Sequence, residues 1–228
     1  MTHHRATRAE INLKAFKHNL QNLKTILGSK TDIMAVIKAD AYGHGALPCA
    51  KAAIESGVGY LGAGVIEEGI ELRKNGIRGP VLILGGIFPD EVADLVHHNL
   101  STMLYTSHLA EALSKEGEKQ GKTINIHIKV DTGMNRLGVL PENLLALTEK
   151  ICSLPNLKIE ALSTHFSSAD DENLSTTNQQ IELFKKALNK LKNAGIIPPL
   201  THLANTSALF RFPESHSKMV RPGLILYG

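Results

Sequence analysis

The chain has 228 residues, 43% of them hydrophobic and 21% charged, with a formal net charge of +3, which is ordinary for a globular protein of one large or two small domains. The small charge, the absence of Trp and the lack of a basic run argue against nucleic-acid or membrane binding, and no apolar run approaches the roughly 20 residues that span a bilayer. The N-terminus lacks a secretory signal, and Cys49 and Cys152 have no metal-like spacing, so we expect a soluble, cytoplasmic protein with reduced thiols and no metal site.

The N-terminal segment divides into an extended arm and a helix. Residues 1–12 show no apolar periodicity and are predicted to form the arm. From residue 13 onward, leucines and one phenylalanine recur every three or four positions, which predicts an amphipathic helix before the first strand. No Pro/Gly/Ser-rich linker interrupts the rest of the chain, so residues 13–228 are predicted to form one domain.

Eight short apolar segments then alternate with stretches of helical spacing. The predicted strands are residues 33–38, 58–65, 81–84, 101–105, 124–130, 159–164, 200–204 and 220–227. Strands that alternate with helices indicate βαβ units and a parallel sheet. Eight units over this length favour a closed, eight-stranded (β/α)8 barrel of the TIM type over an open doubly wound sheet, although counting alone does not decide between them.

The segment after the first predicted strand, residues 38–45, carries the strongest chemical signal. Lys38 ends a buried apolar run, where an ammonium group is costly unless it is paired or used chemically. A lysine desolvated at such a place can form a Schiff base with an aldehyde. Tyr42 and two glycines follow, and they suit close approach to an anion. We therefore expect Lys38 to be buried in the barrel mouth and to anchor pyridoxal 5'-phosphate; the alternative is a lysine that reaches solvent before a glycine turn.

Other polar residues follow the predicted strands, at the end of a barrel where active sites form. They are Lys129 and Arg136 after the fifth strand, His165 after the sixth, His202, Asn205, Thr206 and Ser207 after the seventh, and Arg221, Gly223 and Leu224 in the eighth. Each group also has a structural interpretation, because the residues after Lys129 suit a turn, His165 suits a core, and Asn205 suits a helix cap. Arg221 is harder to explain in this way, because a buried guanidinium needs an acceptor.

Together these motifs resemble the alanine racemases, pyridoxal-phosphate enzymes of fold type III. The matching segments are residues 35–45, 129–138, 164–166, 202–205 and 221–228, in family order and over nearly the whole chain. The resemblance implies that Lys38 holds the cofactor as an aldimine and then acts as one of two catalytic bases. The implied reaction interconverts L- and D-alanine through a carbanion and supplies D-alanine for peptidoglycan.

The same resemblance implies a role for each remaining site residue. Arg221, oriented by His202, would hydrogen-bond the pyridine nitrogen and leave it unprotonated, because a guanidinium does not give up its proton. Arg136 would bind the substrate carboxylate. Lys129, carbamylated in some members, would hold Arg136, and His165 would pack at the cofactor. The residues expected to seat the phosphate are Tyr42, Asn205, Thr206, Ser207, Gly223 and Leu224.

The chain departs from the family pattern at two places and stops short of one part of it. The family often has Gly at Asn135, and usually Ser-Ala at Thr206 and Ser207. The second base of the family is a tyrosine of a C-terminal β-domain reached across a homodimer. Because the sequence stops at Gly228, just behind the eighth strand, we expect the natural protein to continue. We also expect these 228 residues alone to bind the cofactor weakly and to racemise little.

Three alternatives share the barrel. A racemase for serine, arginine or lysine would carry the same motifs, and the residues that choose the substrate would lie outside this chain. A decarboxylase of the same fold has different motifs. A non-catalytic single-barrel pyridoxal-phosphate protein also lacks a second domain, but it does not typically carry the string at residues 40–45 or the stretch at residues 129–136.

Overall fold

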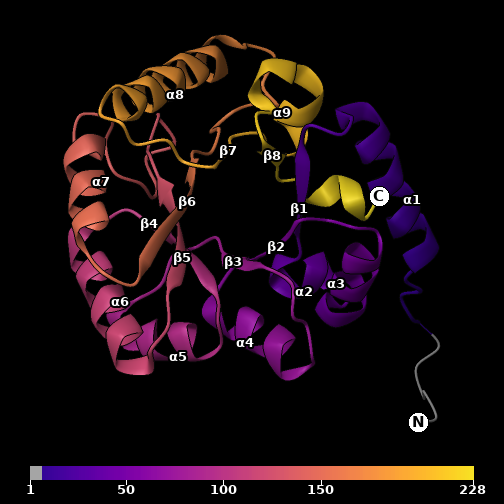
Figure 1. Cartoon of the computed structure of the whole chain (residues 1–228). Coiled ribbons are helices and arrows are strands. Elements are labelled where there is room, and N and C mark those ends of the chain that lie inside the picture. The colour runs from indigo at the N-terminus through magenta and orange to yellow at the C-terminus, as the bar shows by residue number, and fades with distance from the viewer. Residues whose placement is uncertain (1–6) are drawn as a thin grey trace.

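The chain forms a closed parallel barrel surrounded by helices, as the computed structural model of residues 7–228 shows (Figure 1). The eight strands are hydrogen-bonded in chain order, and β8 returns to β1, which confirms the predicted (β/α)8 barrel. The strands are β1 (Asp32–Val36), β2 (Tyr60–Ala63), β3 (Val81–Ile83), β4 (Ser101–Leu104), β5 (Ile124–Lys129), β6 (Leu157–Ser163), β7 (Leu200–His202) and β8 (Met219–Val220). The α-helices are α1 (Leu13–Leu27), α2 (Lys38–Gly43), α3 (Ala46–Glu55), α4 (Ile66–Lys74), α5 (Val92–His97), α6 (Ser107–Gln120), α7 (Leu144–Ser153), α8 (Ser175–Asn193) and α9 (Thr206–Arg211).

The N-terminal helix begins where the apolar spacing predicts. The Asn12 side chain caps α1 by accepting hydrogen bonds from the backbone N–H groups of Lys14 and Ala15, at 3.0 and 3.1 Å, as N-cap asparagines do. Residues 7–12 of the predicted arm form no helix or strand, and residues 1–6 lie outside the described residues. Midway along its length, α1 contacts the C-terminal segment, because the Asn19 amide donates to the Leu226 carbonyl.

The eighth segment differs most from its prediction. Residues 220–227 were expected to form a strand, but β8 ends at Val220 and a 3-10 turn (Leu224–Leu226) follows. Pro222 explains the stop, because proline has no N–H to continue a ladder. The Pro222 carbonyl still accepts a hydrogen bond from Val36 of β1. The closing seam therefore holds Arg221 beside the end of the first strand.

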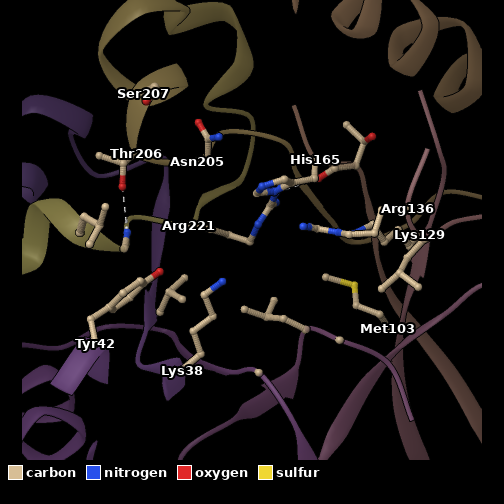
Figure 2. A pocket seen from close by; sticks show the side chains of 18 of the residues that line it. Lys38, Tyr42, Met103, Lys129, Arg136, His165, Asn205, Thr206, Ser207 and Arg221 are labelled. Carbon is tan, nitrogen blue, oxygen red and sulfur yellow. Dashed lines mark hydrogen bonds between the residues drawn. The ribbon is translucent and has the colours of Figure 1, made fainter. Parts of the chain in front are cut away.

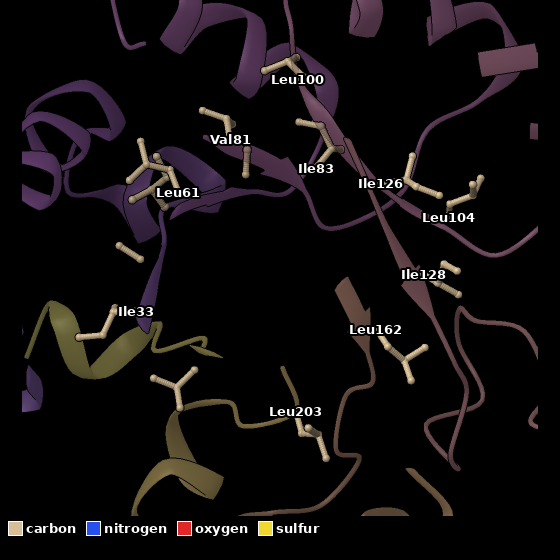
Figure 3. Close-up of a cluster of buried hydrophobic side chains, with 14 of the residues drawn as sticks. Ile33, Leu61, Val81, Ile83, Leu100, Leu104, Ile126, Ile128, Leu162 and Leu203 are labelled. Carbon is tan, nitrogen blue, oxygen red and sulfur yellow. The ribbon is translucent and has the colours of Figure 1, made fainter. Parts of the chain in front are cut away.

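Two apolar layers hold the barrel together. The larger layer lies between the strands and the helices, and Figure 3 shows ten of its labelled side chains spread around the strands. Each fully buried Leu, Ile or Val contributes roughly 1.5–3 kcal/mol relative to exposure. The smaller layer fills the barrel interior with Met34, Tyr60, Leu82, Met103 and Met219. Within residues 7–228, no helix has the length and apolar character required to cross a membrane.

A tight helix–strand contact gives a test of this packing. Gly117 of α6 is buried, and a Cβ built on it would lie 2.6 Å from Ile124 Cδ1 and 2.8 Å from the Lys122 carbonyl oxygen. Gly-to-Ala substitution inside a helix gains about 1 kcal/mol from propensity, whereas overpacking typically costs about 1–3 kcal/mol. Because the backbone cannot move away like a side-chain tip, we expect Gly117→Ala to lower the free energy of unfolding in a urea titration. The exposed neighbour Glu118→Ala serves as the control, and a stabilised Gly117→Ala protein would contradict the packing.

Candidate functional site

A cavity of about 650 Å³ opens among the loops that follow the strands. Every sequence-predicted site residue except His202 lines it (Figure 2). The lining residues among those predicted are Lys38, Tyr42, Lys129, Arg136, His165, Asn205, Thr206, Ser207, Arg221, Gly223 and Leu224. His202 is completely buried behind Arg221, to which it is hydrogen-bonded. The fold thus brings residues from five different strands or strand ends to one place.

Lys38 is the first residue of α2, which is an unusual left-handed turn rather than an ordinary right-handed helix. β1 ends at Val36, and the four residues from Ala39 to Tyr42 have φ between 51° and 54°, the left-handed region that non-glycine residues seldom enter. The Glu68 carboxylate holds this turn by accepting hydrogen bonds from the backbone N–H groups of Ala39 and Gly64, both at 2.6 Å. Lys38 itself is exposed rather than buried, so the expected burial is wrong. Lys38 nevertheless lines the cavity.

Tyr42, Thr206 and Gly223 form a close group on one wall of the cavity. The Gly223 N–H donates to Thr206 Oγ1 at 3.0 Å. A Cβ on Gly223 would lie 2.6 Å from the Tyr42 hydroxyl oxygen, so a larger residue there would have to displace the tip of Tyr42. Desolvation by burial raises the pKa of Tyr42. Asn205 caps α9 by accepting from the Ala208 N–H at 3.0 Å, so the structural interpretation of Asn205 is correct as well.

Arg221 is a buried cation surrounded by hydrogen-bond acceptors. Nη1 contacts His202 Nδ1 at 2.6 Å and the His202 carbonyl at 2.8 Å. Nη2 donates to the carbonyls of Thr164 and Leu203, at 2.7 and 3.0 Å, and contacts His165 Nδ1 at 3.1 Å. Desolvation lowers the pKa of Arg221 to about 10, so the group stays charged at neutral pH. Its orientation is fixed by acceptors on β7 and in the loops that follow β6 and β7.

His165 is held in a neutral state by the same contacts. A guanidinium can only donate, so His165 Nδ1 must accept from Arg221 and the ring proton must lie on Nε2. Burial, followed by the charges of Arg221, Lys129 and Arg136, lowers the pKa of His165 to about 3. The cavity therefore contains a neutral imidazole among cations.

Lys129 and Arg136 follow each other around the loop after β5. Lys129 is 5% exposed, and burial, then the charges of Arg221 and Arg136, lower its pKa to about 8. Asp131 shapes the loop by accepting hydrogen bonds from the N–H groups of residues 133–135. Asn135 has φ of 55°, which explains why asparagine can stand where the family often has glycine. The unmodified lysine repels Arg136, so it cannot hold that side chain by charge.

Two supporting residues escaped the sequence analysis. Gln180 of α8 is buried and ties two loops together, because its amide donates to Thr132 Oγ1 and the His165 carbonyl while its oxygen accepts from the Ser167 N–H. Glu68 anchors the turn next to Lys38 in a similar way. Both lie on helices without any motif, so no pattern in a single sequence would have distinguished them from ordinary helix residues.

A family model described as "Alanine racemase, N-terminal domain" matches residues 11–228. The chain belongs to the alanine racemase N-terminal domain family. The alanine racemase of Desulforamulus reducens is 41% identical over 221 residues, which are 96% of this chain and 60% of that protein. That of Carboxydothermus hydrogenoformans is 44% identical over 220 residues, with 96% and 59% covered. The chain thus spans about 60% of the length of these curated relatives.

Solved alanine racemases share the fold closely. The Clostridium difficile 630 enzyme in complex with cycloserine superposes with a TM-score of 0.96 at 35% identity, covering 100% of this chain and 63% of that one. The Bacillus anthracis enzyme with bound L-Ala-P gives a TM-score of 0.93 at 30% identity, covering 100% and 59%. The barrel of this family is therefore present from the helix that precedes β1 to the end of the chain.

The depressed pKa of Lys129 predicts how stability depends on pH. Its pKa falls from an ordinary 10.5 to about 8 on folding, so the unfolded chain binds more protons than the folded one between these values. Stability must then rise as the pH rises through this window. We expect the free energy of unfolding, measured by denaturant titration in CO₂-free buffer, to increase more from pH 8 to pH 10 in the wild type than in Lys129→Met. Equal slopes for the two proteins would contradict the assignment.

Proposed function

We propose that this chain is the pyridoxal-phosphate-binding part of an enzyme that interconverts L- and D-alanine. The observation that carries the proposal is the placement of Lys38 and Arg221 beside the paired strands β1 and β8, both lining one cavity in a chain of this family. A primary amine and a fixed guanidinium at one cavity suit a cofactor with an aldehyde and a ring nitrogen. The relatives named as alanine racemases support alanine as the substrate.

The residues present fit that cofactor on three counts. Lys38, Lys129, Arg136 and Arg221 bring positive charge to a cavity whose lining includes one carboxylate, that of Asp170, so the site favours an anionic ligand. The hydroxyls of Tyr42, Thr206 and Ser207 face the same cavity and suit a phosphate. Gly223 provides backbone surface where a Cβ would strike Tyr42. Asn205 and Leu224 complete this wall.

The cofactor, when bound through its aldehyde, would withdraw electrons from an attached amino acid and so acidify the α-hydrogen. Lys38 would hold the cofactor and later carry a proton on Nζ. Arg221 would donate a hydrogen bond to the ring nitrogen. Because the guanidinium stays protonated, that nitrogen would remain unprotonated and the carbanion less stabilised, which favours fast return of the proton over side reactions.

Racemisation also needs a substrate anchor and a second proton carrier. Arg136 is exposed at the cavity and would bind the substrate carboxylate. Neutral His165 would pack against the cofactor without adding charge. Inversion at Cα requires removal of a proton on one face and its return on the other, hence two positioned groups. We propose that Lys38 serves one face and that a tyrosine outside these 228 residues, in a homodimer, serves the other. The D-alanine formed would be used for peptidoglycan, and the reaction would take place in the cytoplasm.

Lys38→Ala tests the anchor directly. The protein is mixed with pyridoxal phosphate and passed through a gel-filtration column. The absorbance band at a longer wavelength than that of the free aldehyde is then recorded. We expect the wild type to retain the band and Lys38→Ala to lose it, because Lys129, the other lysine of the cavity lining, is only 5% exposed. Lys30→Ala, at an exposed lysine before β1, is the matched control. Retention of the band by Lys38→Ala would show that Lys38 is not the cofactor anchor. Faster racemisation of L-serine than of L-alanine by the full-length protein would contradict alanine as the preferred substrate.

Carbamylation of Lys129 would resolve the repulsion from Arg136. An amine with a pKa of about 8 is partly neutral at pH 7. A neutral amine adds CO₂ through a new N–C bond and releases one N–H proton to solvent, which gives an anionic carbamate. That group would accept hydrogen bonds from Arg136 and so hold it. We expect a carbamate signal in ¹³C NMR of the protein in ¹³C-bicarbonate, absent from Lys129→Ala and kept in Lys30→Ala. A wild-type spectrum without the signal would mean that Lys129 stays a cation.

A further inference from the structure

The buried guanidinium of Arg221 has no carboxylate among its direct partners in residues 7–228. Its hydrogen bonds go to backbone carbonyls and to the imidazoles of His202 and His165. A charge removed from water is costly unless an opposite charge compensates it. The nearest carboxylate connected to it by hydrogen bonds is Glu160, two side chains away.

That connection runs through the barrel interior in one direction. His202 Nδ1 must accept from Arg221, so the ring proton of His202 lies on Nε2. His202 Nε2 is 2.9 Å from His127 Nδ1, which must then be the acceptor. The proton of His127 is left on Nε2, which lies 3.3 Å from Glu160 Oε2 and donates to it.

The same logic excludes a charged imidazole within this series of hydrogen bonds. A proton on His127 Nδ1 would face the Nε2–H of His202, and His202 could give up that proton only as an anion. Burial lowers the pKa of both rings, in agreement with two neutral imidazoles. The negative charge that balances Arg221 must therefore lie at the far end.

Local backbone geometry delivers Glu160 to that end. The pairing of β5 with β6 shifts register between Ile126 and His127, so Ile126 faces Ile159 and His127 faces Ala161. Glu160 is the unmatched residue of this bulge, and bulges re-aim side chains. Burial alone would raise its pKa, but hydrogen bonds from His127 and Tyr60 outweigh this and lower it. Its side chain is only 18% exposed.

We propose that Glu160, acting through His127 and His202, is the remote counter-charge of Arg221 and a positioning residue for the cavity. Each neutral imidazole is polarised by the carboxylate, which makes His202 Nδ1 a stronger acceptor for Nη1. Arg221 is thereby kept cationic and fixed in orientation. The consequence of this arrangement for the cofactor rests on the proposed function. The hydrogen bonds from Arg221 to Glu160 do not depend on it.

The hydrogen-bond series from Arg221 to Glu160 is tested without cofactor, by ¹⁵N NMR of histidine-labelled protein at pH 7. We expect His127 and His202 to be neutral with the proton on Nε2, assigned by the signals lost in His127→Gln and His202→Gln. An Nδ1–H tautomer, or a doubly protonated ring, at either position would overturn the proposal.

Glu160→Gln then tests the charge, because the amide keeps the size and an acceptor oxygen. We expect the His202 Nδ1 signal to shift although this atom does not touch Glu160, whereas the exposed control Glu149→Gln leaves it in place. An unchanged His202 signal in Glu160→Gln would overturn the proposal, since a merely structural contact would not transmit through the first ring. If wild-type protein bound no pyridoxal phosphate, the proposed function would fail while these spectra still decided the role of Glu160.

Discussion

Closure of the barrel between β8 and β1 is the contact on which the site depends. The paired strands contribute Asp32 with Met219 and Ile33 with Val220, and the hydrogen bond from Val36 to Pro222 extends the seam. The seam brings the first and last motifs of the chain together, because parallel strands present their carboxyl ends at the same mouth. Lys38 and Arg221 are separated by most of the sequence yet line one cavity. The closing helix contact, from Asn19 to Leu226, supports the same junction from outside.

The site is organised by positive charge that the protein only partly compensates. Arg221 is satisfied by carbonyls and neutral rings, Lys129 is buried near two guanidinium groups, and Arg136 stands exposed at the rim. Burial lowers the pKa of Lys129 and that of His165, and the neighbouring cations lower both further. Such a field attracts anions, and it agrees with neutral imidazoles that accept hydrogen bonds from Arg221.

The sequence predicts the architecture and most lining residues, because both follow from local patterns. Alternating apolar segments locate all eight strands, and polar residues at strand ends locate the cavity. The errors come from backbone geometry. Lys38, which precedes a left-handed turn, is exposed, and Pro222 ends β8 early. The bulge that turns Glu160 toward His127 had no prediction at all, because no pattern in the sequence indicates it. His127 stands two positions before Lys129 on β5, so the period of two in strands places both on one face. Glu68 and Gln180 act only through tertiary contacts, which no single-sequence pattern contains.

The left-handed run from Ala39 to Tyr42 allows the site to lose its geometry while the barrel stays folded. Each such residue costs roughly 1–2 kcal/mol relative to a right-handed conformation, and the Glu68 carboxylate is one of the contacts that keep the run in place. A segment with stored strain can open locally before the body of a domain does. Breathing confined to this stretch would carry Lys38 and Tyr42 out of alignment while the eight strands remained paired. Loss of ligand affinity on warming can then precede the melting of the barrel.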